Sequence, residues 1–179
     1  LETESVNFEN AVSCCPVCSP YRASLLTGRY PLSHGMIMND LQLNTKATSF
    51  AQALKAAGYN TGYIGKWHLD GSGRSSYIPQ ERRQGFDYWK VLECTHDYNK
   101  SAYYANESDK ILYWNGYDAY AQTEDAKKYI NENAQNDNPF ALFVSWGPPH
   151  NPYRTGPEKW LNYYSSRDFK IRENVPPED

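Results

Sequence analysis

Capping residues in one segment and apolar positions in another predict two short helices in the first third of the chain. In the first segment, Ser19 suits the N-cap of a helix, Pro20 suits its first helical position and Gly28 suits its C-terminal end. The second runs over Thr48–Ala57, where apolar side chains share one face, and Gly58 follows it. The pattern therefore predicts two helices, each closed by a glycine.

The pattern changes to that of strands and a further helix later in the chain. Tyr59–Gly65 alternates like a short strand, and Phe140–Trp146 is almost continuously apolar, which is typical of a strand buried on both faces of a parallel sheet. Ala119–Ala134 has the period of a helix, and Val6–Phe8 is a weak extended segment. The tyrosine-rich stretch 88–117 gives no clear assignment.

The order helix, strand, loop, helix, strand predicts an α/β fold with crossover connections. Ligands of such sheets bind beyond the carboxyl ends of the strands. His68 and His150 each follow a predicted strand, in loops rich in glycine or proline, so we expect them to share a site. The polar tail, 157–179, is expected to pack on something outside this chain.

Composition narrows the class of protein. A chain of 179 residues, 40% of them hydrophobic, is long enough for one domain with a core. A net charge of -3 argues against nucleic-acid binding and against an anionic membrane surface, and the longest apolar run, Phe140–Val144, is too short to span a bilayer. The 16 tyrosines and 5 tryptophans fit a core, with a sugar-stacking platform as the alternative.

The segment SCCPVCSPYRASLLTGR holds three of the four cysteines. It can be interpreted as half of a zinc site, as a redox dithiol, or as the position of one activated side chain. Cys14, Cys15 and Cys94 fit small buried hydrophobic residues. Cys18 differs, because we expect it just before a helix start, where unpaired N–H groups attract an anion and Arg22 lies one turn further on.

Three motifs in order carry a family resemblance: Cys18–Arg29 (CSPYRASLLTGR), Gly62–Leu69 (GYIGKWHL) and Pro149–Pro152 (PHNP). Together they resemble the formylglycine-dependent type I sulfatases, an arylsulfatase-like family of the alkaline phosphatase superfamily. The resemblance implies a mixed, mostly parallel sheet flanked by helices, of which this chain holds a part. It also implies a sulfuric ester hydrolase that acts on sulfated carbohydrates.

The resemblance assigns roles to five residues. Cys18, oxidised to formylglycine, would be the nucleophile and a metal ligand, and Arg22 would hold its hydrate. Lys66 would bind a sulfate oxygen, His68 would take a proton as sulfate leaves, and His150 would help to protonate the leaving oxygen.

The same resemblance implies one divalent cation, Ca²⁺ or Mg²⁺, whose remaining ligands lie outside this chain. We therefore expect 1–179 to be a partial catalytic domain, without the N-terminal metal-ligand strand and the C-terminal part, and inactive alone. A formylglycine-generating or sulfatase-maturating enzyme is the implied partner, with a periplasmic or secreted location. Alternatives are a phosphonate or phosphate monoester hydrolase, a non-catalytic binder of anionic glycans, and a zinc module. His34 is expected to be structural or at the pocket rim, and His96 has no assigned role.

Overall fold

The computed structural model describes residues 2–170 and 173–174. Its α-helices are α1 (Cys18–Thr27), α2 (Pro31–His34), α3 (Phe50–Ala56), α4 (Asp118–Asn133) and α5 (Glu158–Ser165). Its strands are β1 (Asn60–Lys66), β2 (Tyr88–Leu92), β3 (Ala102–Ala105), β4 (Leu112–Tyr113) and β5 (Phe140–Ser145). Short 3-10 helices cover Glu2–Glu4, Gln80–Arg82 and Tyr153–Thr155. No described helix is long and apolar enough to cross a membrane.

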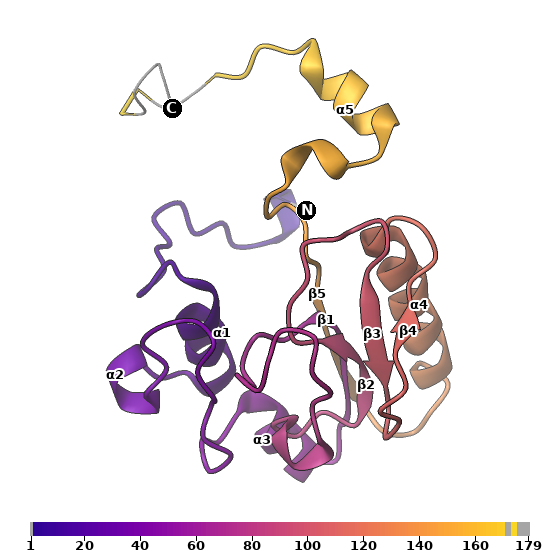
Figure 1. Ribbon diagram of the computed structural model, residues 1–179. Coiled ribbons are helices and arrows are strands. Elements are labelled where there is room, and N and C mark those ends of the chain that lie inside the picture. The colour runs from indigo at the N-terminus through magenta and orange to yellow at the C-terminus, as the bar shows by residue number, and fades with distance from the viewer. Residues whose placement is uncertain (1, 171–172, 175–179) are drawn as a thin grey trace.

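The strands form one five-stranded sheet in the order β4-β3-β2-β1-β5. β1 is parallel to both β2 and β5, whereas β3 and β4 are antiparallel additions at the far side. The predicted mixed α/β sheet with crossovers is confirmed, and β1 and β5, which correspond to the two predicted strands, lie side by side and parallel (Figure 1). Their carboxyl ends therefore meet at one edge.

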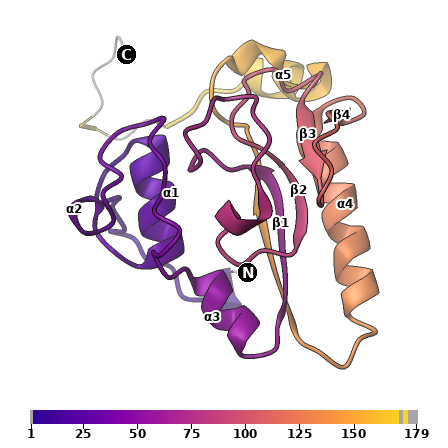
Figure 2. The same ribbon diagram turned by 60° about the horizontal axis from the view of Figure 1, so that its bottom comes forward.

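Helices cover both faces of this sheet. Tyr63 and Ile64 are neighbours in β1, so their side chains point to opposite faces. Tyr63 belongs to the larger core cluster, which includes Ala23 and Leu26 of α1 and Ala51 of α3. Ile64 belongs to the smaller cluster, beneath α4. Both ribbon views show α1 on one side of β1 and β2 and α4 on the other (Figures 1 and 2).

Aromatic side chains fill the core on the α1 side. Tyr63 lies with its ring centroid 5.0 Å from those of both Trp67 and Phe143. Trp67 and Trp89 are 5.1 Å apart and cross at 71°, and both side chains are almost completely buried. These rings account for part of the high aromatic content as core packing.

Helix α1 begins earlier than the sequence predicts. Its N-cap is Val17, which gives no side-chain cap, and Ser19 lies buried inside the first turn, so the prediction of Ser19 as N-cap is wrong. The Ser19 N–H instead donates to Oδ1 of Asn39, 2.9 Å away, so a distant loop supplies the cap that the local sequence lacks. The predicted stop is confirmed, because Gly28 has φ 67° and its N–H donates to the Ser24 carbonyl.

Further findings concern the sheet and the chain ends. β5 is half-exposed over most of its length, so the expected burial on both faces is wrong; among the described strands only β1 pairs with it. Val6–Phe8 forms no strand, and the unassigned stretch 88–117 holds β2, β3 and β4. In the tail, α5 leaves all its side chains exposed or half-exposed, and 171–172 and 175–179 lie outside the described residues.

Candidate active site

Arg22 ties α1 to the carboxyl edge of the sheet. Its Nη1 donates to the carbonyl of Lys66, at the end of β1, over 2.9 Å, and to Oγ of Ser145, at the end of β5, over 2.7 Å. The hydroxyl of Tyr63 donates to the same Lys66 carbonyl over 2.7 Å. Cys18 and Arg22 are four residues apart on α1, so the helix start is held at this edge as well.

Gly65 allows β1 and β5 to approach closely beside Lys66. It has φ +106°, and a Cβ built on it would lie 2.1 Å from the Ser145 carbonyl oxygen. Only glycine fits this combination of backbone angle and distance. Lys66, at the very end of the strand, is 8% exposed.

His68 is held by a carboxylate from a separate loop. Its Nε2 lies 3.1 Å from Oδ1 of Asp40, and Asp40 also accepts from Arg74, over 3.0 Å at Oδ2 and 3.3 Å at Oδ1. Burial lowers the pKa of His68 to about 4, with smaller effects from Asp40, which raises it, and from Lys66 and Arg22, which lower it. His68 is thus a neutral imidazole near pH 7.

The backbone around this contact is specialised. Asp40 and His68 have φ of 62° and 60°, a region that costs an ordinary residue about 1 kcal/mol or more and persists only where the surroundings fix it. Beyond His68, the buried carboxylate of Glu93 accepts N–H bonds from Leu69, Asp70 and Gly71. Glu93 thereby holds the loop that follows the histidine.

His150 lies on the loop after β5 and is exposed. Its Nδ1 is 3.0 Å from the Asn151 carbonyl, which can only accept, so Nδ1 carries a proton and donates it to this carbonyl. The ring stacks on His96, with centroids 4.5 Å apart and planes 12° apart. The pKa of His96 is lowered by burial and, to a smaller extent, by the positive charges of His150, Lys66 and Arg74.

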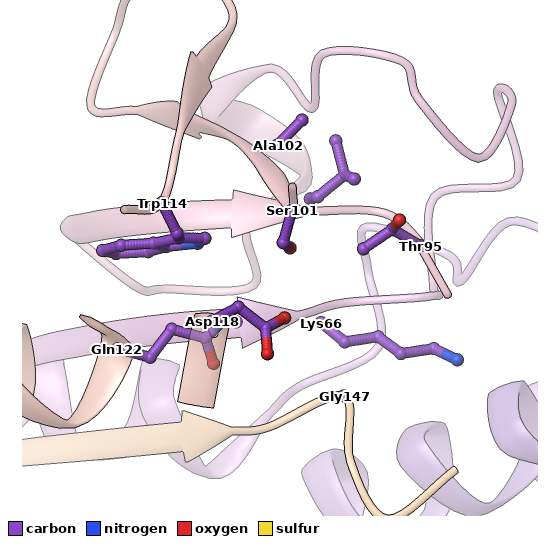
Figure 3. A pocket seen from close by; sticks show the side chains of 10 residues that line it. Lys66, Thr95, Ser101, Ala102, Trp114, Asp118, Gln122 and Gly147 are labelled. Atoms are coloured by element: carbon purple, nitrogen blue, oxygen red, sulfur yellow. The ribbon is translucent and has the colours of Figure 1, made fainter. Parts of the chain in front are cut away.

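A small pocket extends behind Lys66, beyond the ends of β1 and β2. It is lined by Lys66, Asp118, Gln122, Ser101 and six further residues. Figure 3 shows the Lys66 side chain running away from the Asp118 carboxylate. Burial raises the pKa of Asp118 to about 6, and one oxygen each of Asp118 and Gln122 has no hydrogen-bond partner among the described residues.

Cys18 is half-buried at the first position of α1, not before the N-cap as expected, and lines a shallow depression with Tyr21 and others. Cys94 is buried as expected. The same expectation is wrong for Cys14, which is exposed, and for Cys15, which is half-exposed, because the loop before α1 lies on the surface.

The structure thus gathers Arg22, Lys66 and His68 around the ends of β1 and β5. Sequence reasoning missed Asp40 and Arg74, which lie in loops without any local motif; the other missed residues are Asn39, Ser145 and His96. His34, expected to be structural or at the rim, is buried between Ser24 and the Met36 N–H.

Positively charged and imidazole side chains dominate this edge, so it suits a ligand with a negatively charged, several-oxygen group. The carboxylates needed for a hard divalent cation are not gathered there: within the described ranges, no group of three or more His, Cys, Asp or Glu side chains could hold a metal ion.

An α/β sheet with cations and imidazoles at its carboxyl edge has the features of a site that binds anionic ligands. The sulfatase family model matches residues 1–174, and the chain belongs to the sulfatase family. It is 52% identical over 177 residues to the ulvan-active sulfatase of Formosa agariphila, covering 99% of this chain and 35% of that protein.

Solved structures agree with this assignment. The putative sulfatase yidJ from Bacteroides fragilis superposes with a TM-score of 0.85 at 34% identity, over 92% of this chain and 41% of that one. BT4656, solved in complex with its substrate D-glucosamine-2-N,6-O-disulfate, gives a TM-score of 0.72 at 28% identity, over 93% of this chain and 32% of that one. The chain therefore spans about a third of the length of such relatives.

Proposed function

We propose that the full-length protein hydrolyses sulfate esters of sulfated carbohydrates, with residue 18 as nucleophile after conversion of Cys18 to formylglycine. The observation that carries this proposal is the contact of Arg22, one turn from Cys18, with the ends of β1 and β5, where Lys66 and His68 also lie. The sugar class is supported by the relatives, which are named as an ulvan-active sulfatase and as an enzyme bound to a glucosamine disulfate.

Formylglycine, in its hydrated form, would supply an oxygen nucleophile that can later release sulfate without a second attack on sulfur. A maturation enzyme, the proposed partner, supplies the oxidant for the conversion. Arg22 orients residue 18, and Lys66 neutralises a sulfate oxygen. His150, when Nε2 carries a proton in addition to the Nδ1 proton that binds the Asn151 carbonyl, protonates the leaving alcohol, and His68 accepts a proton when sulfate leaves.

A divalent cation, Ca²⁺ or Mg²⁺, is part of the proposal for the full-length protein. The described residues do not form its site, so residue 18 would be the one ligand from this chain and the others would come from outside it.

The test uses the full-length protein, produced with a maturation enzyme, and compares wild type with Cys18→Ala and the matched control Cys14→Ala. We expect Cys18→Ala to lower kcat/KM for sulfate-ester hydrolysis by about 10³-fold or more, because the nucleophile is lost. Cys14→Ala, an exposed position in the same loop, should leave kcat/KM within about twofold of wild type.

Two measurements complete this test. Mass spectrometry of the peptide that carries residue 18 should show the replacement of sulfur by oxygen together with the loss of two hydrogens, which distinguishes an aldehyde from a serine. Paired sulfate and phosphate esters of one alcohol should be hydrolysed with a preference for sulfate. Full activity of Cys18→Ala, or a preference for the phosphate ester, would overturn the proposal.

A further inference from the structure

The Asp40 carboxylate joins the proposed site to a loop that carries none of the sulfatase motifs. One of its oxygens accepts from His68, and Arg74 donates to both oxygens. The preceding residue, Asn39, accepts the Ser19 N–H at the start of α1. One pair of neighbouring side chains therefore fixes both His68 and the helix turn that presents residue 18.

The contact with Asp40 determines which nitrogen of His68 is protonated. The hydrogen bonds from Arg74 and His68 hold the pKa of Asp40 at about 2, so near neutral pH its carboxylate can only accept. Nε2 of His68 must then carry the proton, and Nδ1 must carry the lone pair. His68 is 2% exposed, and its Nδ1 has no hydrogen-bond partner in the described part of the chain.

A buried imidazole nitrogen with a free lone pair is poised to accept a proton from a group placed beside it. Nothing else in the described residues uses this lone pair. The charged groups that act on the ring are Asp40 on its Nε2 side, Lys66 and Arg22 from the strand end and α1, and Arg74 through Asp40. These contacts hold the ring in one orientation and one tautomer.

We propose that Asp40 is the positioning residue of the sulfate-release step, orienting His68 so that Nδ1 is the proton acceptor, with Arg74 holding Asp40 in place. This inference rests on the function proposed above. In the step, the O–H bond of the remaining hydroxyl of residue 18 breaks and its proton moves to Nδ1. The electron pair becomes the second carbon–oxygen bond, while the bond to the sulfate oxygen breaks and its pair leaves with sulfate.

The first test determines which ring nitrogen of His68 carries the proton, and it does not depend on enzyme activity. Full-length protein, in its unmatured cysteine form and labelled with ¹⁵N-histidine, is studied by NMR, and His68→Gln assigns the signals. We expect a protonated Nε2 and an unprotonated Nδ1 for His68 at pH 7. In Asp40→Asn this preference should be lost, because an amide can donate to Nε2 as well as accept from it. A wild-type spectrum with the proton on Nδ1 of His68 would overturn the inference, whether or not Asp40→Asn folds.

The second test separates the two halves of the reaction in the matured full-length protein. Asp40→Asn should lower kcat by about 10- to 100-fold, the usual range for a carboxylate that orients a functional histidine through a hydrogen bond. The initial burst of released alcohol, about one per site, should remain, because only sulfate release is slowed. The matched control is Asp137→Asn, an exposed aspartate in the loop before β5, which should match wild type.

Equal kcat for Asp40→Asn and Asp137→Asn would overturn the inference, as would loss of the burst together with the slower turnover. Asp40→Glu, which keeps the carboxylate, should recover part of kcat and the wild-type tautomer. Failure of the underlying function is recognised separately, because wild type itself would then release no alcohol from sulfate esters.

Discussion

Gly65 offers a sharp test of how the proposed site is built. It pairs with Val91 on one side and Ser145 on the other, directly before Lys66. An alanine Cβ at this position would lie 2.1 Å from the Ser145 carbonyl oxygen and 2.8 Å from its carbon. Because both atoms belong to the backbone of a paired strand, they can move only if the β1–β5 ladder is disturbed.

The size of the effect follows from two separate costs. The positive φ of 106° costs about 2 kcal/mol for a residue with a Cβ. Displacing the Ser145 carbonyl weakens one or two ladder hydrogen bonds, at about 1 kcal/mol each. Gly65→Ala should therefore reduce the free energy of unfolding by about 4 kcal/mol. Gly28→Ala is the matched control, because Gly28 has φ +67° with no atom within 4 Å of the added Cβ, and should cost about 1–2 kcal/mol.

Urea denaturation of the full-length protein, followed by circular dichroism, measures both free energies. A difference of about 2–3 kcal/mol between the variants corresponds to a difference of roughly 100-fold in the unfolding constant. Equal losses for Gly65→Ala and Gly28→Ala would refute the steric argument, since both positions share the backbone cost and only one has the carbonyl contact.

Three further expectations concern stability and can be checked by the same denaturation experiment. Ser49→Ala removes the capping box of α3 and a buried hydroxyl hydrogen bond, so it should cost about 1–2 kcal/mol. Arg82→Met removes the ion-pair partner of Asp70, which is 1% exposed, and should lower the free energy of unfolding by about 3 kcal/mol. The double variant Arg82→Met/Asp70→Asn should recover most of this loss, because no unpaired charge then stays buried. Asp118→Asn should stabilise the protein by about 2 kcal/mol above pH 6 and have little effect below pH 4. The reason is that the pKa of this carboxyl is about 6 in the folded state, above its usual value of 3.8, so the folded state holds its proton more tightly than the unfolded state does. The stability of the wild-type protein therefore falls as the pH rises from 3.8 to 6. Equal effects of Asp118→Asn at pH 4 and pH 7 would contradict the last expectation.

The sequence predicted the elements whose causes are local. The glycine after α1, the helix ended by Gly58 and the alternating strand before Lys66 depend on neighbours in the chain, and the structure has each of them. The start of α1 was misjudged because its cap, Asn39, lies 20 residues away. No local pattern marks a residue that caps a helix across a loop.

The same division applies to the site. Arg22, Lys66 and His68 lie in motifs, whereas Asp40 and Arg74 act on His68 from loops separated from it by 28 and 6 positions. The length of β5 was nearly correct, but its burial was not, because burial depends on which strands lie beside it. The periodicity of the sequence identifies a single strand, but it does not show which strands lie beside that strand in the folded sheet.

The two buried tryptophans beneath the site give the protein a built-in optical signal. Indole rings whose centroids are 5.1 Å apart and whose planes cross at 71° couple their ultraviolet transitions, and the coupling depends on their mutual orientation. Trp67 is the residue directly before His68, and Trp89 belongs to β2, next to β1. A change in the circular dichroism of this pair would therefore report a movement of the strand end that carries Lys66 and His68, without any label.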